Sequence, residues 1–143
     1  MTPLADIAGI TLVLASVELW TRSVWVRAAG MNNSTSDRLD QEHHRALQRW
    51  GQEIKAARAR GASGDDPPRQ PGERLMDVAL ALTDDLDTEY RSVSTQAGGT
   101  GTEWHLYRSF EPAVPDQASQ LTLKVSDADG QLVRELVLDL PEA

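Results

Sequence analysis

The densest group of chemically capable side chains is acidic, with Asp84, Asp85, Asp87 and Glu89 standing close together along the chain. Crowded carboxylates supply the hard oxygen ligands that Ca²⁺ prefers, but this run lacks the glycine and the terminal bidentate glutamate of an EF-hand loop. A turn in which Asp side chains accept hydrogen bonds from nearby backbone amides explains the run equally well. We expect a structural turn and keep calcium binding as an alternative.

The spacing of the three histidines does not predict a metal site. His43 and His44 are neighbours, and adjacent helical residues point about 100 degrees apart, so the two cannot face one metal ion. His105 stands alone, and the chain has no cysteine. We predict no metal and no cofactor, with His43 packed in the interior or at an interface.

Motifs for covalent catalysis or phosphate binding are missing from the sequence. There is no Gly-x-Ser-x-Gly, no cysteine near a histidine, and no glycine-rich loop between a strand and a helix. We therefore predict that the protein is not an enzyme. A small hydrolase with a catalytic triad assembled from distant residues is the catalytic alternative.

The tryptophans of the predicted strands differ in the environment that the sequence gives them. Trp104 fits a core position, whereas Trp25 lies between Val24 and Val26, which we expect to face inward. Trp25 then points outward, toward solvent, the inserted helix or a partner. An exposed tryptophan serves as an interface anchor or as a platform on which a sugar stacks. We expect the helix to cover it and keep carbohydrate binding as an alternative.

The N-terminal elements that position these side chains follow a period of two, which is typical of strands. The alternation of residues 10–19 changes phase near Ala15 and Ser16, which predicts either one long strand with a bulge there or two short strands. Thr21-Arg22 forms a turn to a partner strand over 24–28.

Period two returns after residue 77. Strands are predicted from Val78, over 90–95, and up to Pro112, the last with Trp104, Leu106 and Phe110 on one face, while Ala97 to Gly101 forms a loose segment.

The final hairpin has the clearest register. Asp129-Gly130 favours a two-residue turn, which places Ala128 opposite Gln131. Counting outward gives three pairs: Leu123 with Leu136, Leu121 with Leu138, and Lys124 with Glu135.

Between these strands the period changes to 3.6, which predicts an inserted amphipathic helix over 34–61, running from about Ser36 to Arg60. Thr35 or Ser36 can cap its start, and Gly61 suits its C′ position. Residues 62–74 read as a flexible linker. The whole chain, 1–143, is expected to form a single domain, mainly β, an antiparallel two-layer β-sandwich of immunoglobulin-like architecture with this one insertion.

The stretch from Thr83 to Leu123 carries a resemblance. It contains Thr-Asp-Asp-Leu-Asp-Thr-Glu-Tyr, Gly98-Gly99, Glu103-Trp104 and Phe110-Glu-Pro112. This order resembles uncharacterised actinobacterial β-sandwich proteins, and the segment from Val17 to Arg27 looks similar to the opening of those chains. The resemblance implies the sandwich and assigns no catalytic residue.

The charge composition of the chain limits the kinds of partner that it can bind. The net charge is −8, from 14 Lys and Arg against 22 Asp and Glu, and the acidic residues are spread through the chain. We therefore expect no nucleic acid and no membrane partner. Without a signal peptide or a spanning segment, and without cysteine, a cytoplasmic location is favoured.

We predict a non-catalytic interaction or structural module that contacts another protein, or a second copy of itself, through the 36–60 helix. The predicted contact residues are Leu39, His43, Leu47, Trp50, Ile54 and Trp25. The alternative is a calcium- or carbohydrate-binding module.

Overall fold

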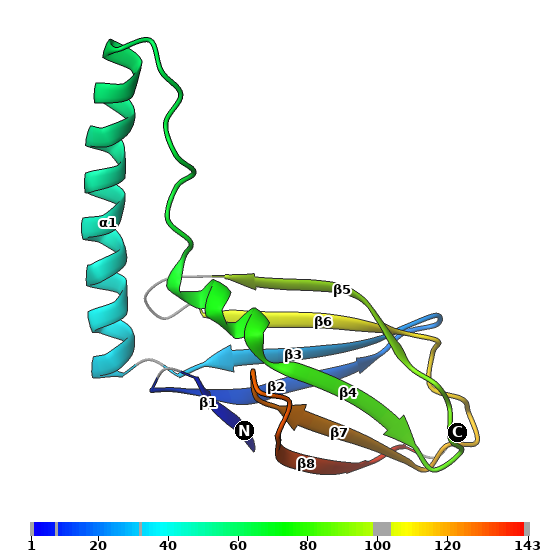
Figure 1. Ribbon diagram of the computed structural model, residues 1–143. Coiled ribbons are helices and arrows are strands. Elements are labelled where there is room, and N and C mark those ends of the chain that lie inside the picture. The colour runs from blue at the N-terminus through cyan, green and yellow to red at the C-terminus, as the bar shows by residue number, and fades with distance from the viewer. Residues whose placement is uncertain (1, 8, 32, 99–103, 142–143) are drawn as a thin grey trace.

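The computed structural model describes residues 2–7, 9–31, 33–98 and 104–141. Its strands form two antiparallel sheets that face each other (Figure 1). The larger sheet has the order β1-β2-β3-β6-β5 and the smaller one β4-β7-β8. This confirms the predicted mainly β, two-layer sandwich with one α-helix. The strands are β1 (Thr2–Ile7), β2 (Ile10–Leu19), β3 (Val24–Gly30), β4 (Ala79–Asp84), β5 (Arg91–Gly98), β6 (His105–Glu111), β7 (Gln120–Ser126) and β8 (Leu132–Asp139).

The core lies between the two sheets and follows from the alternation in each strand. On β3 the inward side chains Val24, Val26 and Ala28 are buried, while the residues between them are only half-buried. On the facing sheet Leu121, Leu123 and Val125 of β7 are fully buried. Leu106 and Phe110 lie on the inner face of β6, and Trp104, directly before this strand, is buried with them. Burial of these apolar side chains is what holds the layers together.

The first hairpin contains the predicted bulge, and an unpredicted strand, β1, precedes it. The β2–β3 register shifts between Leu14 and Ser16, so Ala15 is the extra residue that reverses the phase of β2. The chain turns at Thr21-Arg22, where the Trp20 amide donates to the Ser23 carbonyl at 2.9 Å. Strand β1 was not predicted, because its short and mixed sequence shows no clear alternation.

The last hairpin has the predicted register but a different turn. Leu123 pairs with Leu136, and the other two predicted pairs also form. Asp127, not Ala128, faces Gln131, so three residues form the turn, with Gly130 at φ 81°. The predicted two-residue turn is therefore wrong. A bulge between Val125 and Ser126 adds one residue on β8, which restores the register.

The helix α1 (Ser34–Ala59) starts two residues earlier than Ser36, so Thr35 lies inside its first turn instead of capping it. Its end is as predicted. Gly61 has φ 71°, its amide donates to the Arg58 carbonyl, and the Ala62 amide donates to the Ala57 carbonyl at 2.8 Å. These two bonds form a Schellman motif, which needs the left-handed conformation that glycine adopts readily.

The segment after the helix is shorter than the predicted linker. Residues 62–70 have no regular structure, and the 3-10 helix η1 (Pro71–Asp77) occupies the end of the predicted 62–74 range. The predicted loose segment, Ala97 to Gly101, is wrong for Ala97 and Gly98, which belong to β5, and its residues 99–101 lie outside the described residues. Within the described ranges, no helix has both the length and the apolar character needed to cross a membrane.

Candidate functional site

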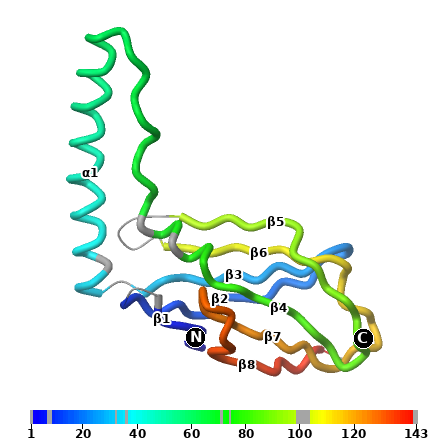
Figure 2. Tube along the Cα trace, in the orientation of Figure 1, coloured from blue at the N-terminus to red at the C-terminus, as the bar shows by residue number. Residues whose placement is uncertain are grey.

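The helix and the chain that follows it form an arm that stands away from the sandwich (Figures 1 and 2). We call α1 together with residues 60–70 the arm. A helix of 26 residues is about 39 Å long at 1.5 Å per residue. The two figures show this length projecting beyond the end of the sheets, with only the start of the helix beside them.

The base of the arm is fixed to the sandwich. Leu39 is buried at 7% exposure and belongs to the same apolar cluster as the inner faces of the two sheets. The next residue, Asp40, accepts a hydrogen bond of 3.4 Å from the indole nitrogen of the core residue Trp104. The arm is therefore held at its first turns, and the rest of its length extends from this anchor.

The apolar stripe of the helix is covered by the returning chain. The indole nitrogen of Trp50 donates to the Asp65 carbonyl at 2.8 Å. A Cβ added to Gly64 would stand 2.0 Å from Ile54 Cδ1, so the returning backbone lies directly on that side chain. Nearer the base, Pro68 lines a hollow beside His43. The arm thus buries its own stripe, as a helix of marginal intrinsic stability must.

These contacts correct the predicted contact set. Leu39 is a core residue, and Trp50 and Ile54 are half-buried under residues 64–65, so these three side chains do not present a free surface. His43 is half-buried in the hollow near Pro68. Leu47, with 37% exposure, is the member of the helix set that remains open to solvent.

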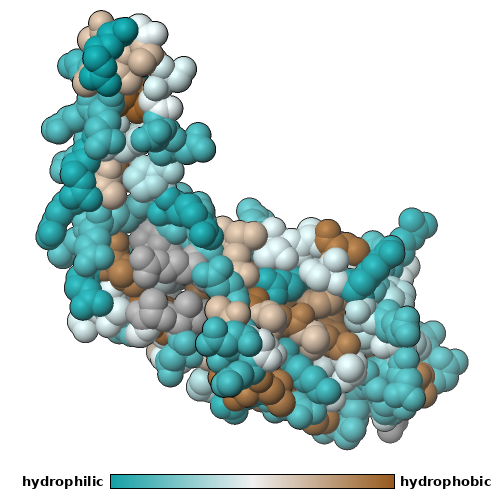
Figure 3. All heavy atoms as spheres, in the orientation of Figure 1, coloured by the Kyte–Doolittle hydropathy of each residue, from teal (hydrophilic) through white to brown (hydrophobic). Residues whose placement is uncertain are grey.

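The outer surface of the arm is polar and differs in charge from the rest of the protein. Figure 3 shows mainly hydrophilic side chains along its visible face. Residues 43–66 contain five Lys or Arg and three Asp or Glu, whereas the rest of the chain contains nine and nineteen. Arg45, Arg49, Lys55 and Arg58 are all exposed. The distal arm is thus a positively charged extension on an acidic protein.

Trp25 lies far from the arm, and the expectation that the helix covers it is wrong. It is the second residue of β3, whereas the arm follows the other end of that strand (Figure 1). Its ring is 6.4 Å from that of Trp20, and the guanidinium of Arg27 lies between the rings of Trp25 and Tyr107, 5.8 Å and 4.6 Å from their centres. His105 stacks on Tyr107 at 4.8 Å.

These five side chains form a row across the outer face of the larger sheet, which we call the aromatic row. Glu18 orders it, since its carboxylate accepts hydrogen bonds from the Trp20 indole at 3.1 Å and from Arg27. The hydrogen bond from Trp20, followed by that from Arg27, lowers the pKa of the Glu18 carboxyl. Trp20 is 56% exposed, so the row is open at that end.

The acidic run at 84–89 has the structural role that the sequence favoured. The Asp84 carboxylate accepts from the Leu86 and Thr88 amides at 2.9 and 3.0 Å, and from the Tyr90 hydroxyl at 2.7 Å. Burial alone would raise the pKa of Asp84, but these hydrogen bonds outweigh it and lower the pKa to about 2. Burial and the bond to Asp84 raise the pKa of Tyr90.

Asp85 ties the same turn to the start of β7. Its carboxylate accepts from the Ser119 hydroxyl and from the Ser119 and Gln120 amides. The hydroxyl bond is the main reason that the pKa of Asp85 is lowered. Both carboxylates are therefore occupied by the protein itself, and the described residues hold no group of three or more His, Asp or Glu side chains arranged for a metal ion.

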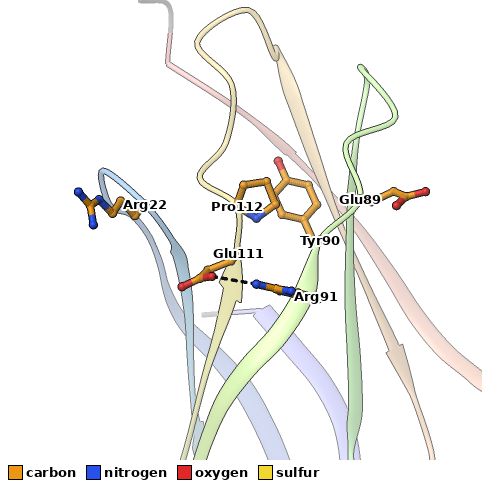
Figure 4. A pocket seen from close by; sticks show the side chains of 6 residues that line it. All are labelled: Arg22, Glu89, Tyr90, Arg91, Glu111 and Pro112. Carbon is orange, nitrogen blue, oxygen red and sulfur yellow. Dashed lines mark ion pairs between the residues drawn. The ribbon is translucent and has the colours of Figure 1, made fainter.

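A hollow of about 670 Å³ lies at the end of the sandwich away from the arm. Arg91 of β5 and Glu111 of β6 form an ion pair of 3.5 Å across it, beside Pro112 (Figure 4). Arg22 and Glu89 also line the hollow, but in Figure 4 their side chains point away from this pair on opposite sides. The charged groups do not converge on one point, and the hollow therefore lacks the geometry of a catalytic centre.

Several features escaped the sequence reasoning. The aromatic row combines Trp20, which follows β2, with Arg27 of β3 and with His105 and Tyr107 of β6, and only knowledge of the β3–β6 pairing brings Arg27 opposite Tyr107. The local charge of residues 43–66 was visible in the sequence as a window of opposite sign. Comparisons of the chain with family models, with curated proteins and with solved structures gave no match.

Proposed function

We propose that the protein is a non-catalytic β-sandwich module that acts through protein–protein contacts made by the outer surface of the arm. The observation that carries this proposal is the projection of the arm: α1 is about 39 Å long, and about 30 Å of it lies beyond the anchor at Leu39. The arm adds little to the sandwich core beyond its first turns. Ordering it costs conformational entropy, which a contact outside the sandwich would justify.

The charge of the arm indicates the kind of partner. A positive extension on a protein of net charge −8 favours an acidic protein surface. Leu47 is also exposed on the arm and supplies an apolar contact. The remainder of the chain is itself acidic, so the arm of one molecule could also bind the sandwich of a second copy.

The test is affinity purification of the tagged protein from its host with variants of the exposed arm. Reversing Arg45 and Arg49 to glutamate leaves the covered stripe intact, unlike changes at Trp50 or Ile54. The proposal predicts that a protein retained by the wild type is lost with this double variant. The matched control reverses exposed Arg134 on β8 and should retain it. Retention by both variants would contradict the proposal, and light scattering of the purified protein separates self-association from a second protein.

A second candidate function is carbohydrate binding at the aromatic row. It is favoured by the exposed Trp20 beside Trp25, with Glu18 and Arg27 next to them as hydrogen-bonding groups. An open indole face can stack on the C–H face of a pyranose while the charged groups bind its hydroxyls. A glycan array with wild type and Trp20→Ala tests it: binding that disappears in the variant supports this function, and absence of binding rejects it.

A further inference from the structure

Arg108 is a charged side chain inside the sandwich. The alternation of β6 directs it inward between Leu106 and Phe110, and it is only 7% exposed. Its Nε donates to the Thr95 hydroxyl at 3.1 Å and one terminal nitrogen donates to the Val78 carbonyl at 2.8 Å. The side chain thus links β6 to β5 and to the start of β4.

The charge of Arg108 is not neutralised by the described residues. None of the ion pairs that they form includes it. Burial lowers the pKa of the guanidinium, as expected for a cation removed from water without a carboxylate beside it. A buried charge without a partner is costly, and a guanidinium has five N–H donors, so most of its capacity is unused.

The unused edge of Arg108 faces outward. Among the described residues, every fully buried side-chain nitrogen or oxygen has a hydrogen-bond partner. The two hydrogen bonds of Arg108 use Nε and one terminal nitrogen, and the second terminal nitrogen takes part in neither. Because it is not among the fully buried atoms without a partner, it must be exposed to solvent. Arg108 lines a hollow of about 310 Å³ together with Asp77, Leu80, Ser92 and Thr95, and we infer that this nitrogen opens into it.

This hollow lies where the sandwich is open. The larger sheet has five strands and the smaller has three, and β4 and β5 each stand at the end of their sheet. Within the described ranges no strand pairs with the outer edge of β4. Met76 and Val93, which are 46% and 45% exposed, are apolar side chains of η1 and β5. A free strand edge is a template on which an extended segment can pair through its backbone.

We propose that an extended acidic segment of a partner protein adds to the free edge of β4 and places a carboxylate against Arg108. Main-chain pairing supplies affinity, and the carboxylate supplies specificity because guanidinium binds carboxylate through two parallel hydrogen bonds. This site is on the sandwich, away from the exposed face of the arm, so it does not depend on the function proposed for the arm.

The probe is a library of heptapeptides displayed on phage and selected on the immobilised full chain. The expected result is a set of peptides with Asp or Glu at one fixed position and β-branched residues around it. A synthetic peptide from this set should shift the amide NMR signals of residues 79–84 and 91–98. Its matched form with Asn or Gln at the fixed position should bind at least tenfold more weakly.

Arg108→Met keeps an unbranched apolar side chain on the inner face of β6 and removes the guanidinium charge, and it should lose at least tenfold in affinity for the acidic peptide. Arg134→Met, on the opposite edge of the smaller sheet, should bind as the wild type does. If Arg108→Met does not fold, the acidic and amide peptides on the wild type still decide the question. Selection without a fixed acidic position, equal binding of the two peptides, or NMR shifts elsewhere would overturn the proposal.

Discussion

Replacing Trp50 with alanine is expected to open the arm while the sandwich remains folded. Trp50 is half-buried against residues 64–65 and donates to the Asp65 carbonyl at 2.8 Å. Truncating a fully buried tryptophan costs about 3–5 kcal/mol, so a half-covered one should cost roughly 2 kcal/mol, including about 1 kcal/mol for the hydrogen bond. A loss of 2 kcal/mol changes an opening equilibrium by about 30-fold.

Hydrogen exchange measured residue by residue is the appropriate assay, since it separates local from global opening. Amides of residues 43–57 should exchange about 30-fold faster in Trp50→Ala, and amides of β7 should be unchanged. The control is Leu47→Ala, at the exposed flank of the same helix, which should change exchange only slightly. Equal acceleration in β7 would show that arm and sandwich unfold together, and unchanged helix amides would show that Trp50 does not hold the arm. Either result would refute the reasoning.

Three further predictions concern stability. The contribution of Asp84 to the free energy of unfolding should be complete above about pH 4 and should be lost as the pH falls toward 2. The reason is that folding lowers the pKa of the Asp84 carboxyl from 3.8 to about 2. The shift corresponds to at most about 2.4 kcal/mol, and solvent screening at this partly exposed group reduces it to roughly 1–2 kcal/mol; denaturant titrations of Asp84→Asn should show a flatter acid limb, and an unchanged limb would contradict this. Gly130→Ala should lower stability by about 1–2 kcal/mol, since the turn needs φ 81°, and thermal unfolding with no decrease in Tm would be inconsistent with that geometry. Gly51→Ala should instead stabilise the helix by roughly 0.5–1 kcal/mol and so slow hydrogen exchange of its amides, because alanine favours the helix over glycine and an added Cβ there meets nothing within 4 Å. Faster exchange in this variant would argue against an exposed helical position.

The strands and their faces were largely predictable because alternation is a local property. Alternation predicted that Val24, Val26 and Phe110 would be buried, and it also placed Arg108 on the inner face of β6, although its burial was not anticipated. The pairs of the last hairpin, such as Leu123 with Leu136, were predicted by counting outward from a two-residue turn, and they form although that turn is wrong, because the bulge between Val125 and Ser126 compensates for the longer turn. Asp127 accepts hydrogen bonds from the Asp129 and Gln131 amides, which stabilises the longer turn in a way that the Asp-Gly motif alone does not indicate.

The exposed surface of the arm was harder to predict because it depends on which segment packs on the apolar side of the helix. The spacing of Leu39, Trp50 and Ile54 shows that the helix has one apolar side, but not what covers that side. A glycine at position 64 lets the returning backbone approach Ile54 closely, and this long-range contact cannot be read from periodicity. The predicted contact face was therefore the covered one, and the exposed charged face is the candidate surface.

The most direct test of the arm as a contact surface is photo-crosslinking in the host. A photoreactive amino acid is placed at Gln41 or Gln52, both exposed on α1, and at Gln117, exposed in the loop before β7, as the control. If the arm makes the contact, a discrete protein adduct should form from the two arm positions and none from Gln117. Adducts from Gln117 alone, or none from either arm position, would contradict the claim that the arm makes the contact.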